Sequence, residues 1–494
     1  MRSMNIQRLI TRSRLCLLGL LGLTLFSSPV SGQVFDSGPS DSELFTLVVN
    51  SPPTPGVFSS FGNGLLQLNI FDGGLIGTDI EANQGGEVNI FGGSLGLNFD
   101  ANFGSEVNIS GGTIGLNFDA DDGSVVNITG GFFDRFLEAS SGSEMNISGG
   151  TLGRGFTVRP GSDVELIGGE FELNGTPFSG PSVSVNVGEV FSGTLADGST
   201  FILSFLETDL LDTSISLTSV ELPTLDLSPV VVATANPVRP SGLRAGQTLT
   251  LVGGGELGEG FEAIDATLNV EGGMLGFGLS ALRSEVNISG GSVGGLFVAH
   301  SGSEVNISGG VVGRNFDATS GSVVNISGGE LGVFFEAMSG SEVNISGGSF
   351  GDFFEAGAGS EVNLFGSNFM LDGVPLDDSL TIGEALTIDS RDVILTGIFA
   401  DGSPFSFVLD PGLVVSDNDI FDPNATLTVT LGPPVPSNII LGDVNQDGVV
   451  DFEDIPAFIA VLQAGEFQVE ADTDENGVVD FSDISSFIAI LIAA

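Results

Sequence analysis

The chain has 494 residues, which is too long for one ordinary compact core and suits two or three domains or an elongated array. Its 63 acidic residues stand against 12 basic ones, and the formal charge of −51 argues against nucleic acid or an anionic membrane as partners. Hydrophobic residues make up 41% of the sequence, too many for a disordered acidic chain, so we expect it to fold. Trp and Tyr are absent, which removes the usual flat aromatic platforms for sugars and bases.

Residues 1–32 have the pattern of a secretory signal peptide. Four Arg precede an apolar run over residues 15–26, and small residues at 30–32 form a cleavage site before Gln33. The apolar run is too short to span a bilayer comfortably, although a retained N-terminal anchor is the alternative. We therefore expect a secreted protein, extracellular or at the cell surface, with no membrane span in the mature chain. Cleavage removes Cys16, the only cysteine, so the mature chain has no disulfide.

A repeat of about 19 residues dominates the rest of the chain. The motif Val-Asn-Ile, or a close variant, recurs at steps of 18 to 20 residues in two series. The Asn positions are Asn69, Asn89, Asn108, Asn127 and Asn146 in the first series and Asn269, Asn287, Asn306, Asn325, Asn344 and Asn363 in the second. Such a period indicates one supersecondary turn per unit, and each turn needs its neighbours to bury its apolar side.

The pattern inside one unit favours short strands. Residues 106–110 alternate polar and apolar side chains, and so do residues 118–120, while Gly pairs between them allow tight corners. We therefore predict a parallel β-helix whose coils lie ~4.8 Å apart. Antiparallel hairpins are the alternative, but the near-constant spacing argues against them. The predicted interior stacks are Phe99, Phe118, Leu137 and Phe156 in the first array and Phe316, Phe335 and Phe354 in the second.

The chain also contains a larger duplication. Asn108 and Asn306 lie 198 positions apart, and each series is followed by similar sequence with an Asp-Gly hairpin turn at residues 197–198 and 401–402. The fold class predicted is mostly β: two parallel β-helix arrays of 19-residue coils, each followed by a β-rich block, and a small α-helical C-terminal domain. The expected segments are a signal peptide (1–32), array 1 (33–168), block 1 (169–235), array 2 (236–367), block 2 (368–431), a Pro-rich linker (432–440) and a calcium-binding domain (441–494).

Outward-facing acidic residues recur from rung to rung. The predicted columns are Glu81, Asp100, Asp119 and Glu138; Asp317, Glu336 and Glu355; Glu87, Glu106 and Glu144; and Glu285, Glu304, Glu342 and Glu361. Adjacent rungs would place carboxylates about 5 Å apart, the spacing of a retaining glycosidase. However, a residue present in every rung serves the repeat, so we favour structural or ion-binding columns over a catalytic site. Val125 and Val323 interrupt the Glu columns, and the Asn column could form an amide ladder.

Few other residues offer catalytic chemistry. His300 is the only histidine, and we expect a solvated turn residue there. Arg154 and Arg314 are expected to pair with outward acids. A polysaccharide hydrolase or lyase stays open as the alternative, with a cleft expected near residues 201–220 or 377–392.

Two twelve-residue segments near the C-terminus carry oxygen side chains at positions 1, 3, 5, 9 and 12 and Gly at position 6. Calcium takes six to eight oxygen ligands, and alternate residues of a tight loop converge on one centre. The predicted ligands are Asp443, Asn445, Asp447, Asp451 and Asp454 in the first loop and Asp472, Asp474, Asn476, Asp480 and Asp483 in the second, with the position-7 carbonyls of Val449 and Val478. We expect two Ca²⁺ sites, followed by apolar helices over 455–462 and 484–491; solvated acidic turns without metal are the alternative.

These paired loops resemble a dockerin type I module, because Asp454 and Asp483 take the place of the Glu that an ordinary EF-hand has at position 12. The resemblance covers residues 441–494. It implies calcium binding and docking onto a cohesin-like or cell-surface protein, in a parent chain that often acts on polysaccharide. The usual partner-contact positions hold residues 452–453 and 481–482, and no basic residue follows residue 440, so a standard cohesin partner is not implied.

The hypothesis from the sequence is a secreted, calcium-binding surface or matrix protein, or a scaffold-associated repeat protein, with a non-catalytic acidic rod. A polysaccharide-degrading enzyme delivered by the same C-terminal module is the rival. Polysaccharide is a second candidate partner.

Overall fold

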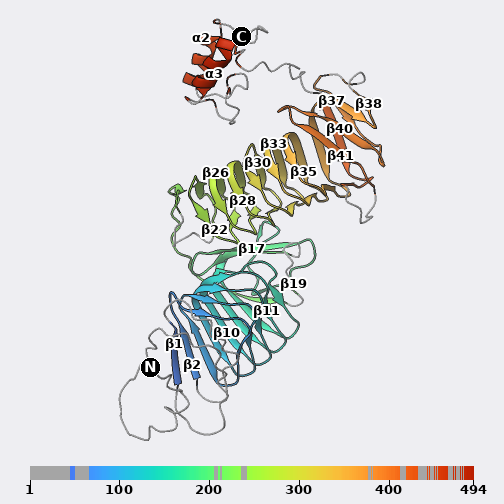
Figure 1. The fold of residues 1–494 in the computed structure, drawn as a ribbon. Coiled ribbons are helices and arrows are strands. Elements are labelled where there is room, and N and C mark those ends of the chain that lie inside the picture. Colours follow the sequence, from blue (N-terminus) through green and yellow to red (C-terminus); the bar gives the residue numbers. More distant parts are fainter. Residues whose placement is uncertain are drawn as a thin grey trace, which may run out of the picture.

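The computed structural model describes residues 45–49, 66–204, 210–211, 214–234, 242–376, 380, 382–411, 419–431, 442, 444–445, 450, 452, 454–464, 471, 473, 479, 481 and 483–493. This part of the chain is mostly β and forms a parallel β-solenoid, with two helices near the C-terminus (Figure 1). The prediction of a mostly β chain built from parallel β-helix repeats is confirmed. The predicted signal peptide and Pro-rich linker lie outside the described residues.

The strands up to residue 219 make the first sheet pair, one sheet of 14 and one of six strands among the described residues. The main path of the larger sheet is β1 (Phe45–Val49), β2 (Leu66–Ile70), β5 (Gly86–Ile90), β8 (Glu106–Ile114), β10 (Val125–Phe133), β12 (Glu144–Thr151), β14 (Asp163–Leu173), β17 (Val190–Leu195) and β18 (Thr200–Ser204). Five further strands pair with members of this path or with each other: β3 (Leu75–Ile76), β6 (Ser94–Leu95), β15 (Thr176–Pro177), β16 (Ser182–Val183) and β20 (Ile215–Ser219). The smaller sheet contains β4 (Ile80–Ala82), β7 (Phe99–Ala101), β9 (Phe118–Ala120), β11 (Leu137–Ala139), β13 (Thr157–Val158) and β19 (Leu210–Leu211).

The strands from residue 230 to 431 make the second sheet pair, with 15 and eight described strands. The main path of the larger sheet is β21 (Val230–Val232), β23 (Thr248–Leu251), β26 (Thr267–Leu275), β28 (Glu285–Val293), β30 (Glu304–Ile307), β33 (Val323–Leu331), β35 (Glu342–Phe350), β37 (Glu361–Leu371), β40 (Ile394–Phe399) and β41 (Pro404–Val408). Five further strands pair with members of this path or with each other: β24 (Glu256–Leu257), β31 (Val311–Val312), β38 (Val374–Pro375), β39 (Ala385–Thr387) and β43 (Thr426–Leu431). The smaller sheet contains β22 (Gly242–Leu243), β25 (Glu262–Ile264), β27 (Ser280–Leu282), β29 (Val298–Ala299), β32 (Phe316–Ala318), β34 (Phe335–Ala337), β36 (Glu355–Ala356) and β42 (Ile420–Phe421). The two helices are α2 (Ile455–Ala464) and α3 (Asp483–Ala493).

Each rung pairs in parallel with its copy in the next rung. Asn108 aligns with Asn127, and Asn306 aligns with Asn325, so the sequence repeat and the sheet register coincide. The antiparallel alternative is therefore wrong for the repeats. Identical residues lie directly above one another, which allows one residue type to form a continuous column along the solenoid.

The interior holds the apolar residues that the alternation assigned to it. Val107 and Ile109 are fully buried, while Glu106, the first residue of the same strand β8, is exposed. All seven predicted members of the interior stacks are buried: Phe99, Phe118, Leu137, Phe156, Phe316, Phe335 and Phe354. Phe99 and Phe118 stack with ring centroids 5.0 Å apart. This dry stack of rings and branched side chains supplies the main stabilisation of the solenoid.

Two corner positions let the chain close each rung. One corner ends in a Ser whose hydroxyl donates to the carbonyl three residues earlier, as Ser124 does to Asp121 at 2.7 Å. The other corner needs a left-handed residue immediately before the inward Phe, Leu or Ile. The residues with positive φ at that corner are Asp79, Asn98, Asn117, Phe136 and Gly155 in the first sheet pair and Gly260, Gly278, Leu296, Asn315, Phe334 and Phe353 in the second.

Both predicted Asp-Gly hairpins are present. β17 pairs antiparallel with β18, and β40 pairs antiparallel with β41. The turn aspartates anchor these hairpins to the preceding rungs, because Asp197 accepts a hydrogen bond from the amide of Gly150 at 2.9 Å and Asp401 accepts one from Gly348 at 2.7 Å. After each hairpin the chain returns to the solenoid, where β20 pairs in parallel with β14 and β43 with β37.

The two sheet pairs contact each other at a junction. Ile202 of β18 packs with Ile264 and Leu282 of the second sheet pair, and its amide donates to Glu262 at 3.0 Å. In Figure 1 the hairpin that contains β17 lies between the two stacks of rungs. We call these contacts, together with those that Arg154, Arg244 and Arg283 make across them, the junction.

Candidate functional site

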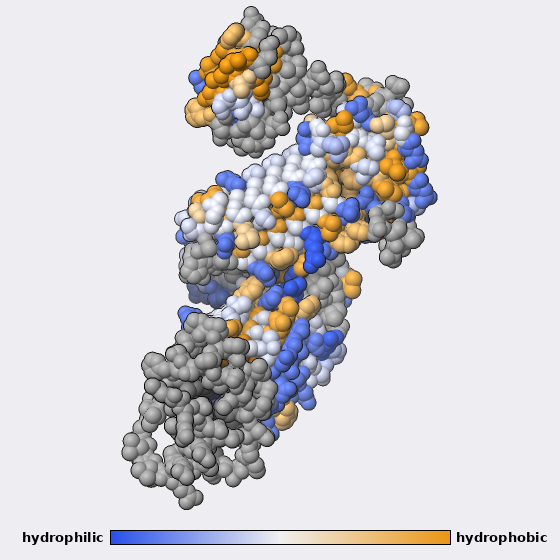
Figure 2. All heavy atoms as spheres, in the orientation of Figure 1, coloured by the Kyte–Doolittle hydropathy of each residue, from blue (hydrophilic) through white to orange (hydrophobic). Residues whose placement is uncertain are grey.

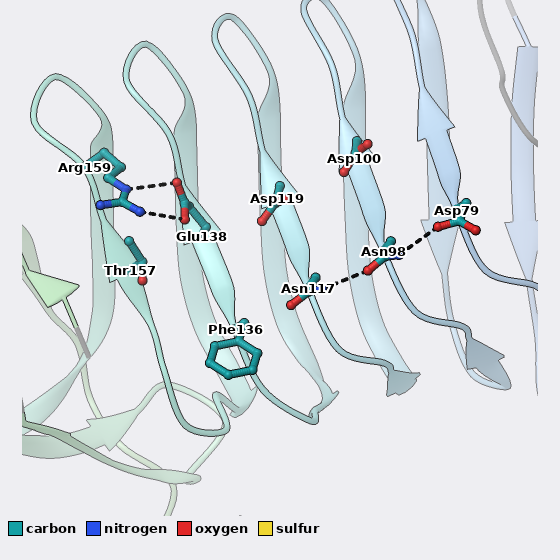
Figure 3. A pocket seen from close by; sticks show the side chains of 9 residues that line it. All are labelled: Asp79, Asn98, Asp100, Asn117, Asp119, Phe136, Glu138, Thr157 and Arg159. Carbon is teal, nitrogen blue, oxygen red and sulfur yellow. Dashed lines mark hydrogen bonds and ion pairs between the residues drawn. The ribbon is translucent and has the colours of Figure 1, made fainter. Parts of the chain in front are cut away.

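A polar groove of about 630 Å³ runs along the outer face of the six-stranded sheet (Figure 3). It crosses successive rungs, so its walls consist of rows of equivalent residues. The lining residues are Asp79, Asn98, Asp100, Asn117, Asp119, Phe136, Glu138, Thr157 and Arg159. Figure 3 shows two rows, one at the left-handed corner and one of outward strand residues. We call this the acidic groove.

The corner row is a hydrogen-bonded ladder that ends in an aromatic ring. Asn98 donates from its amide nitrogen to Asp79 at 2.7 Å, and Asn117 donates to Asn98 at 2.8 Å. Phe136 occupies the next position, with its side chain 46% exposed. Asn tolerates the left-handed conformation, whereas Phe adopts it rarely, so the end of this row departs from what the corner itself requires.

The strand row is the predicted column of acids. Asp100, Asp119 and Glu138 are aligned by parallel pairing of β7, β9 and β11. Thr157 takes the next position of the column, and Arg159, two residues later, makes a bidentate contact to Glu138, at 3.0 Å from Nε and 3.2 Å from a terminal nitrogen. A charge-assisted pair of this geometry fixes both side chains at one end of the groove.

Burial and mutual repulsion shift the titration of these acids upward. Burial, which is the largest cause, and the charges of Glu138 and Asp100 together raise the pKa of Asp119 to about 6. Burial also raises the pKa of Asp100 and of Asp121. A carboxyl of this kind exchanges its proton near neutral pH, as a general acid does.

The second sheet pair carries the same arrangement. The predicted column of Asp317, Glu336 and Glu355 is aligned by β32, β34 and β36. Burial, which is the largest cause, and the charges of Glu355 and Asp317 together raise the pKa of Glu336 to about 7. The raised pKa is therefore a property of the repeat, and it does not distinguish the acidic groove from the equivalent column of the second sheet pair.

The remaining predicted columns are confirmed on the larger sheets. Glu87, Glu106 and Glu144 face outward with Val125 at the interrupted rung, and Val323 interrupts the second Glu column in the same way. Beside them the asparagines donate to one another at 2.9–3.0 Å from rung to rung. The expected amide ladder is present, and it occupies the nitrogen atoms that glycosylation of the Asn-Ile-Ser sequences would need.

Only part of the predicted calcium loops can be located. Asn445, Asp454 and Asp483 are described, and both aspartates are fully buried. The amide of Asn445 donates to Asp454 at 2.9 Å, which brings positions 3 and 12 of the first loop together. The other predicted ligands lie outside the described residues: Asp443, Asp447, Val449, Asp451, Asp472, Asp474, Asn476, Val478 and Asp480. Within the described ranges no three acidic or histidine side chains are grouped closely enough to hold a metal.

Two expectations about single residues are wrong. His300 is fully buried, whereas we expected a solvated turn residue. It directly follows β29, and its amide donates to the carbonyl of Ala281 in the preceding rung at 2.7 Å. Arg154 was expected to pair with an outward acid, but it is largely buried and donates to the carbonyl of Leu296 across the junction at 2.6 Å.

Sequence reasoning found the acid columns but missed the corner row of the acidic groove. Asn98, Asn117 and Phe136 each precede an inward Phe or Leu, and this recurring position was the available signal. The side on which that position lies depends on the geometry of the corner, which the alternation of strand residues does not reveal.

No protein-family model matches the chain, and no curated protein or solved structure matches it. Among the described residues, neither helix has the length and apolarity needed to cross a membrane.

Proposed function

We propose that the protein is a secreted, non-catalytic surface or matrix protein, in which two β-helical arrays form an acidic rod and a dockerin-like C-terminal module attaches it to a protein partner. The observation that carries this proposal is the uniform chemistry of the rungs. Acid columns, amide ladders and raised pKa values recur in both sheet pairs, as with Asp119 and Glu336. A catalytic site needs residues that depart from the repeat, because acid and base must differ in environment.

Calcium binding by the C-terminal segment is part of the same proposal. Asp454 and Asp483 occupy the twelfth positions of the two loops and are both fully buried. A buried carboxylate is costly unless donors or a metal compensate it, and Ca²⁺ would add that compensation in both loops. Phe458 and Phe487 stack with centroids 4.1 Å apart, so the two loop–helix units share one small core.

Docking is supported by exposed apolar residues on the same segment. Phe452 and Phe481 lie at equivalent positions in the two loops and are 76% and 83% exposed. Ile459 and Ile488, also equivalent, are about half exposed on α2 and α3. Figure 2 shows apolar surface gathered on these helices. Exposed apolar groups in such density favour a protein partner, either cohesin-like or at the cell surface.

The calcium proposal is tested by isothermal titration of Ca²⁺ into the full chain after treatment with chelator. We expect two bound ions, reduced to one by either Asp443→Ala or Asp472→Ala, because position 1 supplies a ligand to each loop. Asp163→Ala removes an exposed acid of β14 and should leave both sites. If the titration gives no heat above that of dilution, the calcium sites do not exist.

A polysaccharide-degrading enzyme is the second candidate, and the acidic groove favours it. Asp119, with its raised pKa, lies one rung from Glu138, and the spacing of about 5 Å between rungs resembles that of a retaining glycosidase. However, Arg159 neutralises Glu138 on both oxygens. The test is release of reducing sugar from a panel of polysaccharides by the full chain and by Asp119→Asn. Turnover by the wild type that the variant abolishes would replace the non-catalytic proposal with this one.

A further inference from the structure

Three rungs place a Phe where the backbone favours Gly. The left-handed corner is filled by Gly155, Gly260 and Gly278 in some rungs, but Phe136 has φ 62°, Phe334 has φ 63° and Phe353 has φ 69°. A side chain at this φ crowds the neighbouring carbonyl, and a bulky ring is among the least suited residues. The strained rotation is therefore retained for something other than closing the corner.

Burial does not explain these rings either. Phe136 and Phe334 are each 46% exposed, and Phe353 is partly exposed. Phe334 and Phe353 stack on each other with centroids 4.7 Å apart and an interplanar angle of 12°. This stack offsets part of the strain at Phe334 and Phe353, but no ring in the described part of the chain stacks on Phe136. A bound ligand is therefore the better explanation of why an exposed ring is kept on strained backbone.

The surroundings of the ring are duplicated with it. Figure 3 shows Phe136 continuing the row of Asn117, beside the column that contains Asp119 and Glu138. The second sheet pair has the same four residue types 198 positions later: the two sets are Asn117, Asp119, Phe136 and Glu138, and Asn315, Asp317, Phe334 and Glu336. Both sets face outward on the smaller sheet of their pair.

We propose that these two sets bind a linear, uncharged polysaccharide, with the Phe rings stacked on sugar rings and the carboxylates accepting hydrogen bonds from hydroxyls. An aromatic face matches the apolar face of a sugar, and Phe supplies the platform in a chain without Trp or Tyr. The rows run along the solenoid and repeat at each rung, which suits an extended chain of similar units. The acids repel an anionic polysaccharide. The inference deepens the proposed function, because it names what the acidic rod contacts.

The test is affinity electrophoresis of the full chain in native gels that contain xylan, hydroxyethyl cellulose or mixed-linkage β-glucan. We expect at least one of them to retard the wild type. The triple variant Phe136→Gly, Phe334→Gly, Phe353→Gly should raise the dissociation constant at least tenfold. Its thermal midpoint should stay level or rise, because Gly adopts the left-handed corner without strain.

The matched control is Phe91→Ser, which removes an exposed Phe that directly follows β5, outside the acidic groove, and introduces the residue type found at the equivalent position of the next rung, Ser110. It should bind as the wild type does. The proposal is overturned if no neutral polysaccharide retards the wild type, if alginate alone does, or if the Gly variant binds unchanged. It is also overturned if binding and thermal midpoint fall together, since the rings would then be structural. The calcium titration and the sugar-release assay report on the proposed function separately.

Discussion

The cost of stacking carboxylates in this solenoid falls on individual half-buried acids such as Asp119. Asp119 is about half buried between Asp100 and Glu138, and no cation in the described part of the chain contacts it. The side chain resists ionisation because burial disfavours its charge and the neighbouring acids repel it. The column therefore opposes folding whenever all its members are charged.

The raised pKa values of these acids make the stability of the folded chain depend on pH. The pKa of Asp119 is about 6 in the folded chain against 3.8 unfolded, and that of Glu336 is about 7 against 4.5. Between those values the folded chain binds more protons, so stability falls as pH rises from about 4 to 7. We expect urea midpoints to decrease over this range and the decrease to become smaller in Asp119→Asn and Glu336→Gln.

Glu106→Gln is the matched control for net charge, because it removes one exposed acid from the larger sheet. If it flattens the pH dependence as much as Asp119→Asn does, overall repulsion governs stability and the buried column does not. The variants Glu106→Gln and Asp119→Asn should be compared at constant ionic strength, since salt screens exposed charges more than half-buried ones.

Residue-level prediction from the sequence succeeded where the two-residue alternation decides the outcome. Val107, Ile109 and Phe118 are buried as predicted, because a side chain on a strand can face only inward or outward. It failed at His300, which lies at a corner where strand alternation ends. Whether a corner residue is covered depends on how the surrounding rungs pack around it, and the alternation within one strand contains no such information.

At the scale of elements, the duplicated hairpins have different surroundings. In the first copy Ile202 of β18 is 2% exposed and packs against Ile264 and Leu282. The corresponding residue of β41 is Ser406, which is exposed, and Pro404 opens that strand. Pro removes a hydrogen-bond donor from an edge strand, so the second hairpin is suited to end the array and the first to join two parts.

Substituting Ile202 and Ser406 separately tests whether only the first hairpin is buried at a junction. Ile202→Ser should lower the free energy of unfolding by about 2–4 kcal/mol, because it empties a buried site and places a hydroxyl there. The measurement is urea unfolding followed by far-UV circular dichroism. Ser406→Ala, in the matching strand, should change the midpoint little. Equal effects of both changes would contradict a junction at β18.

The hairpins themselves were predictable, but their contacts were not. The Asp-Gly dipeptides at 197–198 and 401–402 predict turns because Gly takes positive φ without strain. The anchoring of Asp197 to the amide of Gly150 joins residues 47 positions apart, and only the completed stack of rungs brings them together. Local chemistry thus sets the element, while the register of the solenoid sets its neighbours.

At the scale of the whole molecule, the scarce arginines connect the two sheet pairs. Arg154 reaches Leu296, Arg244 contacts Glu170 at 3.1 Å, and Arg283 contacts Glu172 at 2.5 Å. Their equivalents 198 positions away are not arginine, so these contacts belong to the junction and not to the repeat. In a chain of charge −51 each of them also relieves repulsion where two acidic surfaces meet.

The ion pair between Arg283 and Glu172 contributes to the stability of the junction. Both side chains are about three-quarters buried, and Arg283 also contacts Asp265 at 2.7 Å. Its φ of 49° is left-handed, which Asn tolerates, so Arg283→Asn removes the charge and keeps the corner. In a double-mutant cycle with Glu172→Gln we expect a coupling of about 1 kcal/mol in urea unfolding, decreasing as salt is added.

Arg314→Asn, at an exposed position outside the junction, should show no coupling with Glu172→Gln. Small-angle scattering of Arg283→Asn should show a wider range of angles between the two sheet pairs, because one of their links is gone. A coupling near zero, with scattering unchanged, would mean that apolar contacts such as those of Ile202 hold the junction without help from the ion pair.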